Sequence, residues 1–118
     1  MLHRHAALAQ DPRCSPRGFE AHEFFPEKTN VEFAVVEDAR NISMRVFERG
    51  CGETHACGTG ACATQVAAHL LGMTEPAADL HLLGGVLHIA LEGGHVIMTG
   101  PAAMSFSGTV DPKELIAW

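Results

Sequence analysis

The stretch GACATQVAAHLL, residues 60–71, decides how this chain can fold. Small apolar side chains surround nearly its whole circumference, and a helix with that pattern is usually buried on all sides. Gly72 follows directly, at the position where a left-handed C-terminal cap ends many helices. We therefore predict one buried helix over these residues.

Segments with strand character lie on both sides of the predicted helix. VEFAVVED (31–38) is rich in β-branched and aromatic residues, and ISMRVFER (42–49) alternates between two faces. The segment between them has hairpin composition. After the helix, glycine turns separate further predicted strands over 79–83, 86–91, 95–99 and 103–110. The predicted class is α+β, with a mostly antiparallel sheet wrapped around one central buried helix.

The length of 118 residues fits one compact domain with one core. Residues 1–20 show weak periodicity, and we predict a poorly structured lead-in with a helical turn near Ala6–Ala9. Residues 21–118 are predicted as a single domain. The first residues do not resemble a secretory signal, so we expect the four cysteines to be free thiols in a reducing cytoplasm.

The charge of the chain argues against two classes of partner. The net charge is -6 and the eight Lys and Arg residues are dispersed, which disfavours nucleic acids and anionic membranes. No apolar run approaches the roughly 18–20 residues that span a bilayer. Because Cys51, Cys57 and Cys62 lack the CxxC spacing of a zinc site, we expect no bound metal.

Cys57 lies at the start of the predicted helix, in the run Cys57-Gly58-Thr59-Gly60. The first N–H groups of a helix have no partner within it, and the helix dipole favours negative charge there. A cysteine in this position is stabilised as the thiolate. The N–H groups of Gly58 and Thr59 can hold a carboxylate or phosphate, since glycine lets a ligand approach the backbone. A reactive thiol beside such an anion cradle suits chemistry at the α-carbon of an acid or at a carbonyl.

The other cysteines have structural interpretations. Cys62, inside the apolar helix, and Cys14, in the lead-in, are most simply small core hydrophobes. Cys51 lies between two glycines. It either approaches Cys57 through the flexible loop or fills a slot for a small residue.

Three polar residues near this loop also have two interpretations each. Glu48 and Arg49 end a predicted strand, and they form either a solvated pair or a site that recognises a zwitterion. In the second case Arg49 binds a carboxylate and Glu48 an ammonium group. Asn30, before the first strand, is in most proteins simply a turn residue.

Three stretches of the chain together resemble one known family. FPEKTNVEF (25–33), ERGCGETHACGTGACA (48–63) and MTGPA (98–102) are similar to the carboxyl-terminal half of the diaminopimelate epimerases. Proline racemases share the cysteine-glycine-threonine-glycine element. The paired Glu48-Arg49 and the TNVEF segment favour the diaminopimelate family.

The resemblance implies an isomerase that interconverts LL- and meso-diaminopimelate, on the route to lysine and bacterial cell wall, without pyridoxal phosphate or a metal. In this family two cysteines, one per domain, face opposite sides of the substrate α-carbon, and Cys57 matches the second. The remaining matches concern the substrate, an amino acid. Gly58 and Thr59 match amides that hold its reacting carboxylate, and Asn30, Glu48 and Arg49 match residues that bind its amino and carboxylate groups.

The chain departs from the family in length, because the amino-terminal half that carries the first cysteine is missing. We therefore expect a carboxyl-terminal domain that is inactive without its amino-terminal partner. Three alternatives stay open: a non-catalytic remnant or small-anion-binding domain, a fragment of a proline-racemase-like isomerase, and a homodimer in which two Cys57 residues approximate the two-thiol site. The uncovered interface predicts dimerisation or poor solubility.

Overall fold

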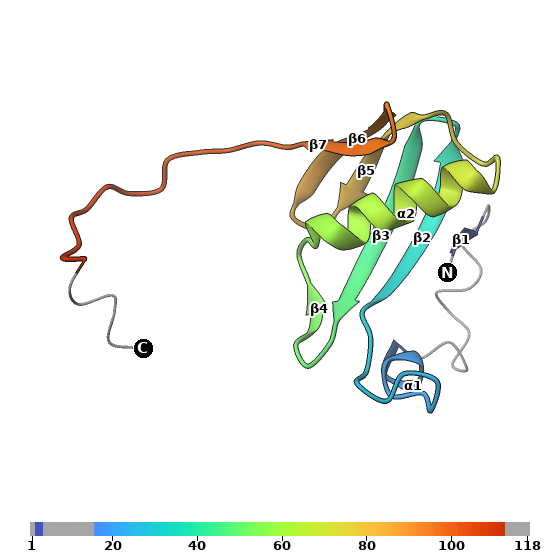
Figure 1. Cartoon of the computed structure of the whole chain (residues 1–118), viewed down its shortest axis with the longest axis horizontal. Helices are drawn as coiled ribbons and strands as arrows, with labels where there is room; N and C mark the ends of the chain where they lie inside the picture. Colours follow the sequence, from blue (N-terminus) through green and yellow to red (C-terminus); the bar gives the residue numbers. More distant parts are fainter. Residues whose placement is uncertain (1, 4–15, 113–118) are drawn as a thin grey trace.

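A computed structural model describes residues 2–3 and 16–112 of the chain (Figure 1). One sheet has the strand order β1-β2-β3-β5-β6-β7, and a further strand, β4, pairs with β3. The strands are β1 (Leu2–His3), β2 (Val31–Asp38), β3 (Asn41–Glu48), β4 (Gly52–Thr54), β5 (Ala77–Leu82), β6 (Gly85–Glu92) and β7 (His95–Thr99). The helices are α1 (Pro16–Glu20) and α2 (Gly58–Leu70).

Most neighbouring strands of the sheet run antiparallel. The pairs β2/β3, β3/β4, β5/β6 and β6/β7 are antiparallel, whereas β1/β2 and β3/β5 are parallel. The parallel pair β3/β5 arises because α2 connects these two strands. The predicted α+β class with a mainly antiparallel sheet is confirmed.

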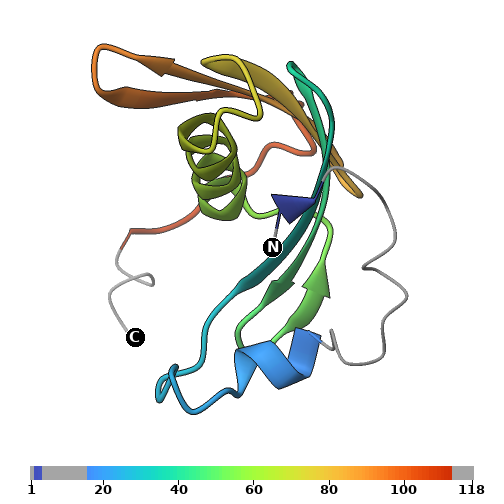
Figure 2. The same ribbon diagram turned by 90° about the vertical axis from the view of Figure 1, so that its right-hand side faces the viewer.

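The sheet curves around α2, which lies on its concave side (Figure 2). The core between them consists of small helix residues, such as Ala61 and Ala68, and larger strand residues, such as Ile42, Leu80 and Ile89. The prediction that α2 is buried on all sides is wrong for this chain. Among the described residues the sheet covers one side of the helix, and residues such as Ala63 and Leu70 stay exposed on the other.

The end of α2 matches its prediction in detail. Gly72 has a φ of 68°, the left-handed conformation that favours glycine. Its N–H donates to the carbonyl of His69 at 2.9 Å, and the N–H of Met73 donates to the carbonyl of Ala68 at 3.0 Å. These two bonds satisfy carbonyls that the last helical turn would otherwise leave without partners.

Besides small shifts at the ends of other elements, the structure differs from the sequence prediction in three places. The helix begins at Gly58 instead of residue 60, and the three-residue strand β4 was not predicted. The predicted strand over 103–110 is wrong, because residues 100–112 form an extended segment without helix or strand that runs away from the sheet (Figure 1). Alternating side chains favour a strand, but a strand also needs a pairing partner, and no strand of the described chain pairs with this segment.

The range 1–20, predicted as a poorly structured lead-in, contains two short elements. β1 pairs with β2 in parallel, and α1 packs near the start of β2. Residues 4–15, which include the predicted helical turn near Ala6–Ala9 and also Cys14, lie outside the described residues. Neither described helix is long and apolar enough to cross a membrane.

Candidate functional site

The face of the sheet that contacts α2 changes from apolar to polar at one end. Val36 and Ala34 of β2 and Val46 of β3 are buried beneath the helix. Because side chains alternate along a strand, Glu32 and Glu48 point to this same face, one step beyond the buried residues of their strands. A polar patch therefore follows the apolar core without a break.

Thr54 of β4 completes this patch. It lies opposite Val46 in the antiparallel pairing of β3 and β4, so it shares the face of Val46. Its hydroxyl donates a hydrogen bond of 2.7 Å to Oε1 of Glu48. We use the name polar end for Asn30, Glu32, Glu48 and Thr54.

The first turn of α2 lies against the polar end. Gly60 is buried, and a Cβ atom added to it would lie only 2.5 Å from Oε1 of Glu32. A Cβ atom on Gly58 would lie 3.1 Å from the sulfur of Met98 on β7. Both glycines of the CGTG element therefore make room for side chains of the surrounding sheet.

Cys57 is the N-cap residue of α2. Its backbone is extended, with φ -139° and ψ 109°, and its carbonyl accepts the first helical hydrogen bond, from Ala61 N–H at 2.9 Å. Its side chain makes no capping bond, and Sγ lies 3.4 Å from Oγ1 of Thr59. The thiol is half-buried against the core. The N–H groups of Gly58 and Thr59 belong to the first turn, where helical N–H groups have no partner within the helix.

Asn30 and Arg49 meet through the backbone. The N–H of Arg49 donates to Oδ1 of Asn30 at 2.9 Å, which fixes Asn30 beside the end of β3. The guanidinium of Arg49 is exposed, and its Nη1 donates to the carbonyl of Glu27 at 3.1 Å. The structure thus brings Asn30, Glu48 and the backbone of Arg49 together, while the Arg49 side chain reaches toward the loop that precedes β2.

Glu32 and Thr54 are candidate site residues that were not predicted from the sequence. Glu32 had a detectable signal, because it is an acidic residue in phase with Ala34 and Val36, on the face that should be apolar. Thr54 had none, since β4 is only three residues long and begins with Gly52. Its role depends on a register that only the folded structure shows.

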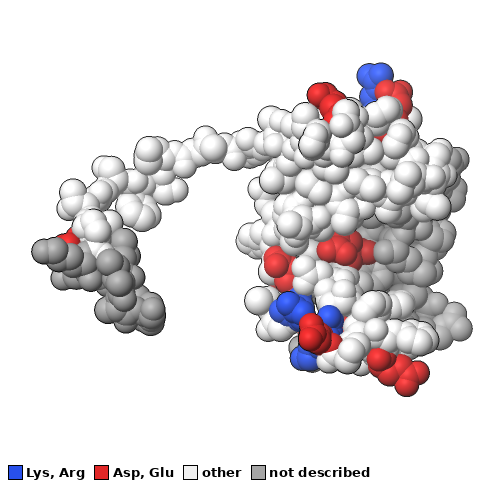
Figure 3. All heavy atoms as spheres, in the orientation of Figure 1, with Lys and Arg blue, Asp and Glu red and all other residues white. Residues whose placement is uncertain are grey.

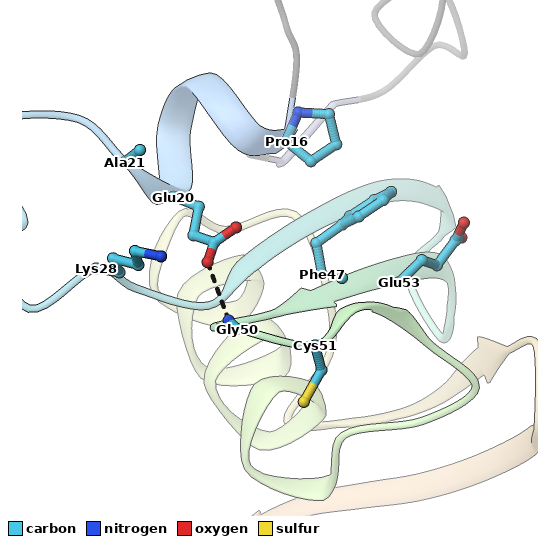
Figure 4. Close-up of a pocket in the computed structure, with 9 residues that line it drawn as sticks. Pro16, Glu20, Ala21, Lys28, Phe47, Gly50, Cys51 and Glu53 are labelled. Carbon is cyan, nitrogen blue, oxygen red and sulfur yellow. Dashed lines mark hydrogen bonds between the residues drawn. The ribbon is translucent and has the colours of Figure 1, made fainter.

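The other described cysteines lie elsewhere. Cys51 is exposed and lines an open pocket of about 660 Å³ between α1 and the turn after β3, where Glu20 accepts a hydrogen bond from Gly50 N–H at 3.0 Å (Figure 4). Cys57 is not among the residues that line this pocket. Cys62 is half-buried, and burial raises the pKa of its thiol. Among the described residues no cluster of three His, Cys, Asp or Glu residues could hold a metal.

The sequence matches one family over most of its length. The profile of the family described as diaminopimelate epimerase matches residues 7–105. Diaminopimelate epimerases of Desulfitobacterium hafniense and Methanococcus maripaludis are 54% and 53% identical to it, over 77% and 79% of this chain. The matched parts are only 32% and 34% of those proteins, so the chain spans about a third of their length.

One solved structure supports the fold. A phenazine biosynthesis PhzC/PhzF protein from Clostridium difficile superposes with a TM-score of 0.53, at 20% sequence identity. The superposition covers 74% of this chain and 33% of that one. At this identity the likeness concerns the architecture, a sheet folded around a helix.

Proposed function

This chain belongs to the diaminopimelate epimerase family, and we propose that residues 21–118 form the carboxyl-terminal half of an epimerase that interconverts LL- and meso-diaminopimelate. The observation that supports this most is the position of Cys57. Cys57 belongs to the part of the chain that matches the family. Its thiol lies at the N-terminus of α2, and the first turn of this helix lies against the polar end of the sheet. A thiol, the first-turn N–H groups of a helix and carboxylates thus occur in one small region.

In the proposed reaction Cys57 exchanges a proton with the α-carbon of the amino acid. The Cys57 thiolate takes the α-proton, so that an S–H bond forms, the Cα–H bond breaks, and the electron pair stays on the substrate. A thiol on the opposite face donates a proton to the same carbon, which inverts the stereocentre. No cofactor takes part in this scheme.

The negative charge that develops during proton removal spreads onto the substrate carboxylate. We propose that the N–H groups of Gly58 and Thr59 bind this carboxylate, because they belong to the first turn of α2 and the helix dipole favours an anion there. Donors that are fixed before the reaction stabilise such charge without reorganisation. This is the main catalytic contribution that we assign to the fold itself.

The remaining site residues orient the substrate. The carboxylate of Glu48 accepts a hydrogen bond from Thr54 through one oxygen. Its remaining acceptor sites bind the substrate ammonium group. The side-chain amide of Asn30, which accepts a hydrogen bond from the N–H of Arg49, contributes a further polar group to the substrate site. Arg49 binds a substrate carboxylate in this proposal, which requires its guanidinium to leave the carbonyl of Glu27.

The second thiol comes from a partner in this proposal. The chain spans about a third of the length of its relatives, and we infer that an amino-terminal half supplies the opposite acid/base group. One thiol alone can remove and return a proton on the same face without inverting the centre. The isolated chain is therefore expected to exchange the α-proton without epimerising the amino acid.

Exchange of the α-proton of diaminopimelate in deuterated water tests the proposal. The chain is kept in reductant, and deuterium incorporation is followed by NMR beside a Cys57→Ser variant and a Cys51→Ser control. Incorporation that depends on Cys57 and not on Cys51 is the expected result. Failure of exchange, even after an amino-terminal half of a relative is added, would contradict the proposed function.

A further inference from the structure

Glu32 is an acidic side chain on the face of β2 that packs against α2. It is half-buried, one alternation step from the buried Ala34. The 2.5 Å between its Oε1 and a Cβ atom built on Gly60 means that no residue other than glycine fits there while Glu32 keeps its position. The Glu32 carboxylate therefore lies directly against the first turn of α2.

The start of α2 has no cap from its own residues. The side chain of Cys57 makes no capping bond, and the first turn contains no acidic residue. Most helices carry a polar or acidic side chain at this position, which offsets the positive end of the dipole. Here the negative charge comes from the neighbouring strand.

We propose that Glu32 is a positioning residue, whose carboxylate fixes the first turn of α2 against the sheet and supplies the negative charge at the helix start that carries Cys57. Gly60 is the matching half of this contact, because its missing side chain admits the carboxylate. The inference extends the proposed function, since it takes Cys57 as the reacting group.

The charge of Glu32 also affects which ligands the site accepts. Glu32 and Glu48 place two carboxylates at the polar end, one of them against the anion-binding helix start. A simple anion that approaches the helix start meets this negative charge. An amino acid offsets it, because its ammonium group lies next to its carboxylate.

The contact itself is tested by a double-mutant cycle in thermal unfolding. Alanine is the better helix former, so Gly60→Ala should stabilise the helix unless the Glu32 side chain obstructs it. We expect Gly60→Ala to lower the melting temperature in the parent chain, because the Glu32 side chain must turn away from the helix, and to raise it in a Glu32→Ala background. The same effect in both backgrounds would overturn the contact.

The charge is tested by alkylation of Cys57 with iodoacetate and iodoacetamide, followed by mass spectrometry of the Cys57 peptide. Iodoacetate is an anion and iodoacetamide is neutral, so the ratio of their reaction rates reports the electrostatic potential at the thiol. Glu32→Gln should raise the iodoacetate/iodoacetamide ratio about two- to five-fold, from the usual size of a charge effect at a helix end. Glu37→Gln removes an exposed charge from the same strand and should leave the ratio unchanged.

An unchanged ratio in Glu32→Gln, or an equal rise in both variants, would overturn the assigned charge. Both experiments work without turnover. A chain that shows these results but fails to exchange the α-proton, even with an amino-terminal half added, would contradict the proposed function and leave the role of Glu32 intact.

Discussion

At the scale of single residues, the hydrogen bond from Thr54 to Glu48 leads to a sharp prediction. The bond is 2.7 Å long and partly buried, and it links β4 to the end of β3. Thr54→Val keeps the shape of the side chain and removes its hydroxyl. We expect it to lower the free energy of unfolding by about 1–2 kcal/mol. Thr54→Ser keeps the donor and should cost clearly less.

Urea unfolding followed by circular dichroism measures this difference. The two variants also separate packing from hydrogen bonding, because serine loses the methyl group and valine loses the hydroxyl. A loss in Thr54→Ser that is as large as or larger than the loss in Thr54→Val would contradict the prediction, because serine keeps the hydrogen bond and loses only the methyl group.

The individual site residues were predictable to different degrees. Cys57 could be found because a glycine-rich loop directly before a helix is visible in the sequence. The contact between Asn30 and Arg49 could not, because it joins residues 19 positions apart through the pairing of β2 with β3. Alternation places Glu32 and Glu48 on one face, but only the packed helix shows which turn of α2 lies opposite.

At the scale of elements, the hairpin between β2 and β3 predicts a pH dependence. The pKa of Asp38 is lowered, chiefly because its carboxylate accepts a hydrogen bond from Arg40 N–H at 2.7 Å, and also because it accepts one from the Asn41 side chain at 3.0 Å. A carboxylate whose pKa is lowered by folding stabilises the folded state at pH values above the pKa that it has in the unfolded chain, which is about 4. This contribution is lost as the pH falls through the folded pKa.

The prediction is tested by urea unfolding from about pH 5 to pH 2, on either side of the usual carboxyl pKa. Asp38→Asn keeps a hydrogen-bond acceptor in the turn but no longer titrates, so the free energy of unfolding should fall less steeply with acid than in the parent chain. Glu37→Gln, which removes the neighbouring exposed carboxylate, serves as the control. A slope that Asp38→Asn leaves unaltered would contradict the prediction.

The elements themselves were largely predictable because most of them carry their own periodicity. The strand β7 was predicted over the residues that it occupies, and its neighbour β6 to within one residue at each end. The segment 103–110 also alternates, yet it forms no strand here. Periodicity describes which side chains can share a face. It does not describe whether a second strand is present to pair with.

At the scale of the whole molecule, the extended segment (residues 100–112) presents apolar side chains to solvent. Met104, Phe106 and Val110 are 88%, 85% and 63% exposed. Figure 3 shows that this segment and the α2 face of the domain carry few charged groups. Exposed apolar surface of this kind is usual at interfaces between proteins. We expect the isolated chain to self-associate as its concentration rises.

The variant Met104→Ser, Phe106→Ser, Val110→Thr tests where this association originates. Because the three side chains are exposed, the variant should unfold at the same temperature as the parent. Its mass by analytical ultracentrifugation should stay near the monomer value of 12.6 kDa at concentrations where the parent associates. Leu83→Ser, in the turn between β5 and β6, removes a comparably exposed apolar side chain and should leave association unchanged. A parent chain that stays monomeric at every concentration would contradict the prediction, and a lower melting temperature of the triple variant would mean that the segment packs on its own domain.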